Sequence, residues 1–77
     1  MDYKNCFSTR LSALRKENNL SLEKTGKAIG VSNQAISKLE KGNGSPSFDV
    51  LCALADYFNV SLDYLVGRSD DPSSHKG

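Results

Sequence analysis

Residues 21–42 carry the feature that most constrains the fold, because they predict two short helices joined by a tight turn. The first helix is expected over about residues 22–29 and ends at Gly30, since glycine enters the left-handed backbone region without steric cost. Ser32 is a good N-cap for the second helix, because its side-chain oxygen can accept a free backbone N–H. That second helix is expected over residues 33–41. The pattern is the helix-turn-helix plan.

The second helix has two unlike faces when it is read at about 100° per residue. One face is apolar apart from Glu40. The other contains amides, a hydroxyl and ammonium groups but no acid, although a helix that only has to be soluble usually carries mixed charge outside. Such groups pair with base edges and phosphates, which favours the major groove of DNA as the partner; an ordinary solvated face is the alternative. The residues of this outer face are Asn33, Gln34, Ser37, Lys38 and Lys41.

The length of 77 residues supports one small domain with a thin core. No apolar run approaches the roughly 20 residues of a membrane span, and no basic-then-apolar signal segment opens the chain. We therefore expect a cytoplasmic protein with no membrane partner.

The distribution of charge along the chain is more informative about a nucleic-acid partner than the net charge is. A net charge of +1 argues weakly against nucleic acid. However, residues 1–45 carry eight Lys/Arg and four Asp/Glu, whereas residues 46–77 carry two and five. The half that contains the two-helix motif is basic, as expected of a protein that presents one face to phosphates.

Residues that carry catalysis or metal binding are few and scattered. Cys6 and Cys52 are far apart, and the only histidine, His75, lies in a polar tail, so we expect no metal site. Free packed thiols are expected in a reducing compartment, with a structural disulfide as the alternative. The sequence has no glycine-rich phosphate loop and no ordered histidine that could activate a serine. It predicts neither an enzyme nor a cofactor, and no small-molecule ligand is evident.

Three further helices are expected around the motif, over about residues 6–18, 48–58 and 62–66. Beyond residue 67 the chain contains no apolar residue, so a domain of residues 1–67 is predicted to precede a disordered polar tail, residues 68–77. The apolar residues predicted to face the core are Phe7, Leu11, Leu14, Phe48, Leu51, Leu54, Ala55, Phe58, Leu62 and Leu65.

These segments resemble the Cro and lambda-repressor type of helix-turn-helix, also called the Xre family. The resemblance rests on LS-x-E at the first motif helix, the turn IGVS and the segment AISKLEKG. Upstream, RLSALRKENNLS is similar to the family's first helix, and downstream PSFDVLCALADYFNVSLDYLVG is similar to its fourth and fifth. The resemblance covers about residues 7–67. It implies an all-α fold, a compact five-helix bundle whose helices 2 and 3 form the helix-turn-helix.

The resemblance also implies the residues that meet double-stranded DNA. The base-reading residues are predicted to be Asn33, Gln34, Ser37 and Lys38. The residues that contact the DNA backbone are predicted to be Arg15, Ser21, Lys41, Asn43 and Ser47, with a plain connector as the alternative for the loop after the recognition helix. Arg10 is expected to pair with Glu40, because the matching arginine of the family pairs with the glutamate of the recognition helix; otherwise both are surface residues.

The first motif helix departs from the family pattern at three positions. The family's usual glutamine is Leu22, which cannot donate to a phosphate through its side chain, although backbone N–H groups there still can. The usual core leucine is Thr25. The usual alanine is Gly26, which lowers helix propensity by about 1 kcal/mol, yet a small residue is expected where the two helices pack closely.

The function implied is a DNA-binding transcriptional regulator, a repressor that occupies a palindromic operator as a homodimer. Because fold does not settle function, a second possibility stays open. The domain could be a protein-interaction module on the same scaffold, such as an antitoxin-like subunit. Leu22 and the low net charge favour that alternative, and the acid-free face of the second motif helix favours DNA.

Overall fold

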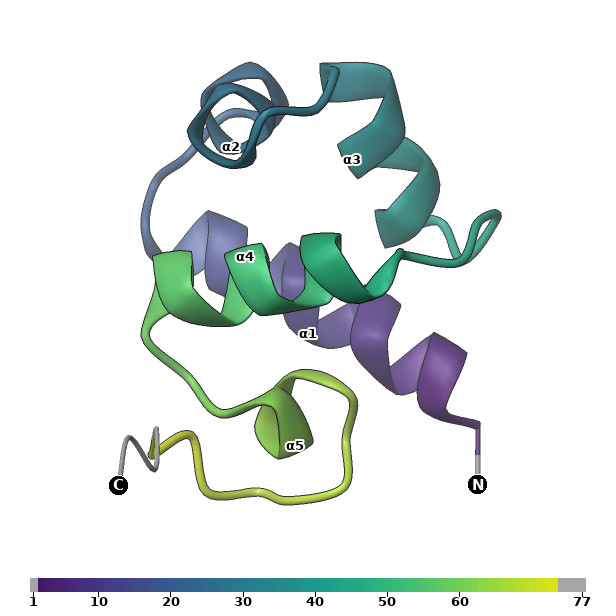
Figure 1. Ribbon diagram of the computed structural model, residues 1–77, viewed down its shortest axis with the longest axis vertical. Helices are drawn as coiled ribbons and strands as arrows, with labels where there is room; N and C mark the ends of the chain where they lie inside the picture. The colour runs from purple at the N-terminus through teal and green to yellow at the C-terminus, as the bar shows by residue number, and fades with distance from the viewer. Residues whose placement is uncertain (1, 74–77) are drawn as a thin grey trace.

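Residues 2–73, the part of the chain that the structure describes, form five helices in a computed structural model. In Figure 1, α2 and α3 lie together at one end of the molecule, α1 and α4 cross in the middle, and α5 lies at the other end. The all-α fold with a helix-turn-helix formed by helices 2 and 3 is thus confirmed. The helices are α1 Tyr3–Glu17, α2 Leu22–Ile29, α3 Asn33–Glu40, α4 Phe48–Phe58 and α5 Leu62–Leu65.

Serine is the N-cap residue of four of the five helices. In each case the hydroxyl oxygen accepts the backbone N–H three residues later, which satisfies one of the free donors of the first turn. The N-caps and their N···O distances are Ser21 at 3.0 Å, Ser32 at 3.1 Å, Ser47 at 3.2 Å and Ser61 at 3.0 Å.

The first helix begins earlier than predicted. Asp2 is its N-cap and accepts the N–H of Asn5 at 3.1 Å, so residues 3–5, which precede the predicted start at about residue 6, form the first turn of α1. A polar first turn needs no apolar face once its free N–H groups have a capping acceptor.

The hydrophobic core lies where α1, α3, α4 and α5 converge. Leu11, Leu54 and Leu65 have no exposed surface, and Ile36, on the inner face of α3, is equally buried. Partly buried apolar residues of α2, α4 and α5 pack against this centre. The core cluster consists of Phe7, Leu11, Leu14, Leu39, Leu54, Ala55, Val60 and Leu65.

Two residues predicted to face the core do not. Phe48 is 71% exposed and Leu62 is 37% exposed. Each is the first residue of its helix, and the core contacts of α4 start only at Val50 and Leu51. Helical periodicity places these residues on the correct stripe, but the stripe extends past the edge of the neighbouring helices.

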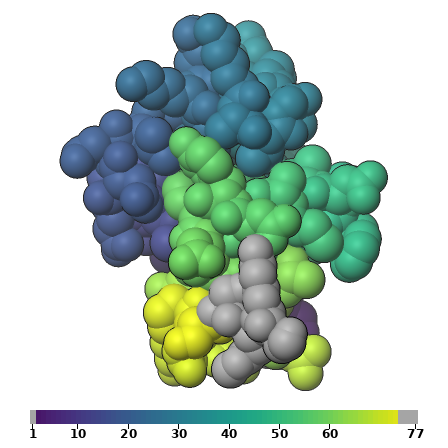
Figure 2. Space-filling model, turned by 60° about the vertical axis from the view of Figure 1, so that its left-hand side comes forward, coloured from purple at the N-terminus to yellow at the C-terminus, as the bar shows by residue number. Residues whose placement is uncertain are grey.

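The chain after α5 folds back on the domain. Backbone N–H groups of Arg68 and Ser69 donate to the carbonyl of Asp63 at 2.7 and 3.2 Å, and the N–H of Ser61 donates to Pro72 at 3.2 Å. Figure 2 shows this segment, in yellow, below the green surface of α4. We expected disorder from residue 68; the structure records these bonds for residues 68–73, and His75 lies outside the described residues.

Two further observations bear on the general character of the chain. Cys6 and Cys52 are both free thiols and half-buried. Within residues 2–73, no helix combines the length and the apolar character that crossing a membrane requires.

Candidate nucleic-acid interface

The outer face of α3 presents unpaired polar side chains. Asn33, Gln34 and Lys38 are exposed, and Ser37 is half-buried. Among residues 2–73, none of these four side chains has a hydrogen bond or an ion pair. The opposite face of the helix is closed, because Ile36 is completely buried and Leu39 is 7% exposed. The structure therefore brings the four predicted base-reading residues together on one helix, with their donors and acceptors free for an external partner.

The start of α3 is set by a very close approach to α2. A Cβ atom added to Gly26 would lie 2.6 Å from the carbonyl oxygen of Val31 and 3.1 Å from the carbonyl carbon of Ser32. Gly30 makes the turn with a φ of +82°, and the N–H of Val31 donates to the carbonyl of Gly26 at 2.8 Å. Glycine at position 26 is thus required by the contact between the helices rather than tolerated in spite of its low helix propensity.

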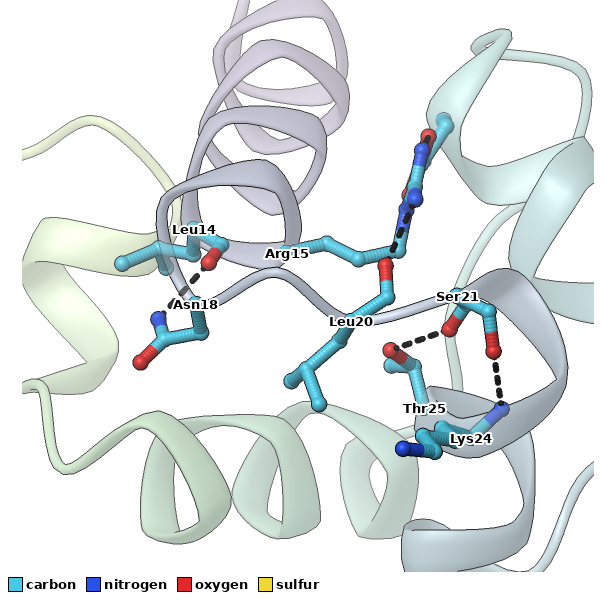
Figure 3. A network of polar contacts seen from close by, with 8 residues as sticks. Leu14, Arg15, Asn18, Leu20, Ser21, Lys24 and Thr25 are labelled. Carbon is cyan, nitrogen blue, oxygen red and sulfur yellow. Dashed lines mark hydrogen bonds and ion pairs between the residues drawn. The ribbon is translucent and has the colours of Figure 1, made fainter.

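The end of α3 is held by an ion pair with α1. The Nε of Arg15 lies 2.5 Å from one carboxylate oxygen of Glu40, and its Nη2 lies 3.1 Å from the other. Its Nη1 donates to the carbonyl of Leu20 at 2.9 Å, and Figure 3 shows Arg15 reaching from α1 to this carbonyl just before α2. Both charged side chains are largely buried, at 15% and 11% exposure. The pair ties the end of α1, the entry to α2 and the end of α3 together.

The expected pairing of Arg10 with Glu40 is therefore wrong. Arg10 contacts α5 and the segment after it: its guanidinium donates to the carbonyls of Tyr64 and Ser69 at 2.8 and 2.7 Å, and to the carboxylate of Asp70 at 2.8 Å. It also lies 4.0 Å from the centre of the Tyr64 ring, within the range of a cation–π contact. On α1, Arg10 and Arg15 are five residues apart and so lie on different faces of the helix.

The ion pair also shifts the pKa of Arg15. The hydrogen bond to Glu40 raises the pKa of Arg15 above its ordinary value, although burial alone would lower it. Because the folded-state pKa is raised, the stabilisation through Arg15 is fully present below the ordinary pKa of arginine and is lost only as pH rises above it. All three guanidinium nitrogens of Arg15 have acceptors inside the protein. The structure therefore gives Arg15 an internal role. Its contact with the DNA backbone stays a prediction.

The other four predicted backbone contacts lie at the surface. Ser21, Lys41, Asn43 and Ser47 are all exposed. As N-caps, the two serine hydroxyls accept a backbone N–H, which leaves each hydroxyl hydrogen free to donate to a phosphate oxygen. The loop begins in a tight turn in which the N–H of Asn43 donates to the carbonyl of Lys38 at 3.0 Å.

Two internal contacts of the motif were not predicted. Thr25, in place of the family's leucine, is completely buried, and its hydroxyl donates to the carbonyl of Ser21 at 3.0 Å. Ser8 is 5% exposed, and its hydroxyl lies 2.7 Å from the carbonyl oxygen of Leu39. Helical spacing could have indicated the burial of Ser8, because it lies three residues before Leu11 on the same stripe of α1.

The fold and this surface define a helix-turn-helix domain, and the chain belongs to the helix-turn-helix family HTH_3, whose model matches residues 11–65. The resemblance to the Cro and lambda-repressor type is thus confirmed. Two relatives are HTH-type transcriptional regulators of Bacillus subtilis. YobD, itself uncharacterized, is 35% identical over 66 residues, or 86% of this chain and 59% of the relative. AnsR is 39% identical over 59 residues, or 77% of this chain and 51% of the relative.

A solved structure with the same architecture is that of the P22 c2 repressor protein in complex with a synthetic operator. It superposes with a TM-score of 0.74 at 37% identity, over 77% of this chain and 89% of that one. The chain spans only about half of AnsR and three fifths of YobD.

Proposed function

We propose that this chain is a sequence-specific, DNA-binding transcriptional regulator that acts in the cytoplasm as a repressor by occupying an operator. The observation that carries the proposal is the outer face of α3, where Asn33, Gln34 and Lys38 are exposed and have no hydrogen bond or ion pair within residues 2–73. Amides pair with adenine and ammonium groups with guanine in the major groove. The operator complex of the related P22 c2 repressor supports double-stranded DNA as the partner.

The DNA backbone is bound by groups at both ends of the motif. The exposed side chains of Ser21 and Ser47 offer hydroxyl donors beside the N-termini of α2 and α4, where free N–H groups favour phosphate. Lys41 and Asn43 add a cation and an amide at the loop after α3. These contacts orient α3 and make binding sensitive to salt, but they do not read sequence.

The regulator binds as a homodimer on a palindrome. An eight-residue helix is only about 12 Å long and reads few base pairs, so useful specificity requires two half-sites, about 34 Å apart. The longest dimension of the domain is 30 Å, which is close to that spacing. Tyr57, near the end of α4, and Leu62, at the start of α5, are exposed apolar residues that a second copy would cover.

Selection from a pool of random-sequence duplexes tests the proposal, with the affinity of the recovered sequences measured by fluorescence anisotropy across salt concentration. A palindromic consensus with a steep salt dependence is expected. Weak, sequence-blind binding that vanishes near physiological salt would overturn the proposal. It would favour the protein-interaction module instead, for which the half-buried Leu22 in place of a phosphate-binding side chain is the supporting observation.

The double variant Gln34→Ala, Lys38→Ala is expected to lose sequence preference while keeping its thermal stability. Each good bidentate base contact discriminates by about 1–3 kcal/mol, so the ratio of specific to non-specific affinity should fall about tenfold or more. Lys27→Ala is the matched control, because it also removes one exposed cation but lies on α2. Unchanged selectivity in the double variant would refute the assignment of α3 as the reading helix.

A further inference from the structure

The end of the recognition helix that carries Lys38 and Lys41 is held to α1 by two polar contacts on adjacent residues. Arg15 binds the carboxylate of Glu40, and Ser8 binds the backbone carbonyl of Leu39. Around these contacts the packing of α3 on α1 is apolar, through Leu11 and Leu39. Apolar contact has no preferred direction and allows one helix to slide along another, whereas a hydrogen bond depends steeply on distance and angle. The polar contacts therefore determine where α3 sits along α1.

The Ser8 contact is a buried hydrogen bond between two helices, as expected of a residue that positions one helix on the other. Its hydroxyl has one hydrogen and two acceptors within reach, the carbonyl of Leu39 at 2.7 Å and that of Lys4, on its own helix, at 3.0 Å. The nearer acceptor is on α3, 31 residues away in the chain, and the bond to it is buried. Serine in mid-helix more often bonds only to the preceding turn of its own helix, as Thr9 does to the carbonyl of Asn5 at 3.0 Å.

The carbonyl of Leu39 also belongs to the turn that leads into the loop. It accepts the N–H of Gly42 at 3.2 Å, and the N–H of Asn43 donates to the neighbouring carbonyl of Lys38 at 3.0 Å. Gly42 has a φ of +75°, and a Cβ added to it would meet the Ser8 oxygen at 3.6 Å. A change in the Ser8 contact therefore reaches the backbone that carries Lys38, Lys41 and Asn43.

We propose that Ser8 is a positioning residue for DNA reading: its buried hydroxyl sets the depth and register of the end of α3 in the major groove. The inference rests on the proposed function, since it assigns Ser8 a role in that binding. Ser8 itself touches no DNA. Its main effect is on the base contact of Lys38, because a base contact tolerates little displacement. The phosphate contacts of Lys41 and Asn43 lie on the same turn, but a change in them affects all duplexes alike.

The test compares Ser8→Ala with the unchanged chain on two duplexes, the consensus recovered by selection and a scrambled duplex of the same length. The ratio of the two affinities is expected to fall at least about fivefold, the effect of losing one typical hydrogen bond, with most of the loss on the consensus. Thr9→Ala is the matched control on α1, because it removes a hydroxyl that bonds only within that helix. Ser61→Ala, which removes the N-cap of α5, controls for lost stability without touching α3.

The outcomes separate this inference from the proposed function. If the unchanged chain selects no consensus, the proposed function fails. If it does, but Ser8→Ala keeps the affinity ratio, or lowers it no more than Ser61→Ala, the positioning role of Ser8 is overturned. Amide hydrogen exchange in the absence of DNA is an independent readout: the N–H groups of Gly42 and Asn43 should exchange faster in Ser8→Ala, and unchanged exchange there would also overturn the inference. Ser8→Thr, which keeps the hydroxyl, should recover part of the ratio.

Discussion

At the scale of single residues, the polar side chains of α1 contact different neighbours because they lie on different faces of the helix. Ser8, Leu11 and Arg15 follow the spacing of three and four residues that keeps side chains on one face, and both polar members of this set contact α3. Phe7, Arg10 and Leu14 follow the same spacing on a neighbouring face, and Arg10 contacts α5. One helix thus orients the recognition helix with one face and the C-terminal part of the domain with another.

Replacing Glu40 by alanine is expected to lower the free energy of unfolding by about 3–5 kcal/mol, because it leaves a mostly buried Arg15 guanidinium without its anion. Urea denaturation at neutral pH measures this change. The double variant Arg15→Met, Glu40→Met should lose less, since no charge is left stranded. A loss below about 1 kcal/mol in the single variant would contradict the prediction, because that is the range of solvent-screened surface pairs.

At the scale of elements, α2 and α3 pack so closely that the position of the recognition helix depends on one missing side chain. The two helices are joined by only three residues, and Gly26 faces the backbone of this turn. Backbone atoms cannot move aside as the end of a flexible side chain can. The angle between the helices, and hence the presentation of α3, is therefore determined by backbone contact rather than by side-chain packing.

Gly26→Ala is expected to destabilise the domain by up to about 2 kcal/mol, the difference between two opposing effects. Alanine improves helix propensity by about 1 kcal/mol, but overpacking against the carbonyl of Val31 costs about 1–3 kcal/mol. Thermal and urea denaturation give the sign. Gly44→Ala is the control, because its added Cβ would meet only a methyl of Leu39 at 3.9 Å and should change stability by less than about 0.5 kcal/mol. A gain in stability from Gly26→Ala would show that the helices have room to spare.

At the scale of the whole molecule, Arg10 connects two segments that are far apart in the sequence. It joins α1, near the start of the chain, to residues 64–70, near its end. Its contacts combine two backbone carbonyls, one carboxylate and one aromatic ring. α5 is only four residues long and could not stay in place through its own hydrogen bonds. Arg10 and the buried Leu65 together hold this end of the molecule.

Arg10→Ala is expected to loosen residues 64–70 and to lower the free energy of unfolding by about 1–3 kcal/mol, because it removes hydrogen bonds from a charged donor. Amide hydrogen exchange at Arg68 and Ser69 should become faster, while exchange in α2 stays unchanged. Arg10→Lys should not restore protection, since an ammonium group cannot reproduce the planar fork of donors. Asp70→Asn is the control with little expected effect, because that carboxylate is fully exposed. Equal effects of Arg10→Ala and Asp70→Asn would contradict this account.

The sequence by itself determined the helices, their caps and most of the core. The bounds of α2 and α4 agree with prediction, and Ser32 caps α3 as predicted, because capping and helical periodicity involve residues only a few positions apart. The two faces of α3 are readable for the same reason. The resemblance to the Xre family added the order and packing of the five helices, which periodicity alone does not specify.

Only the tertiary structure decided which residues from different helices meet. The partner of Glu40 is Arg15 rather than Arg10, Phe48 lies outside the core, and Ser8 reaches Leu39, since each depends on how far one helix is displaced along another. A pattern of apolar residues is unchanged when a whole helix slides or is extended past its neighbour, so it carries no information about that displacement. Directional hydrogen bonds and backbone contacts select one register, and they become visible only when the helices are in place.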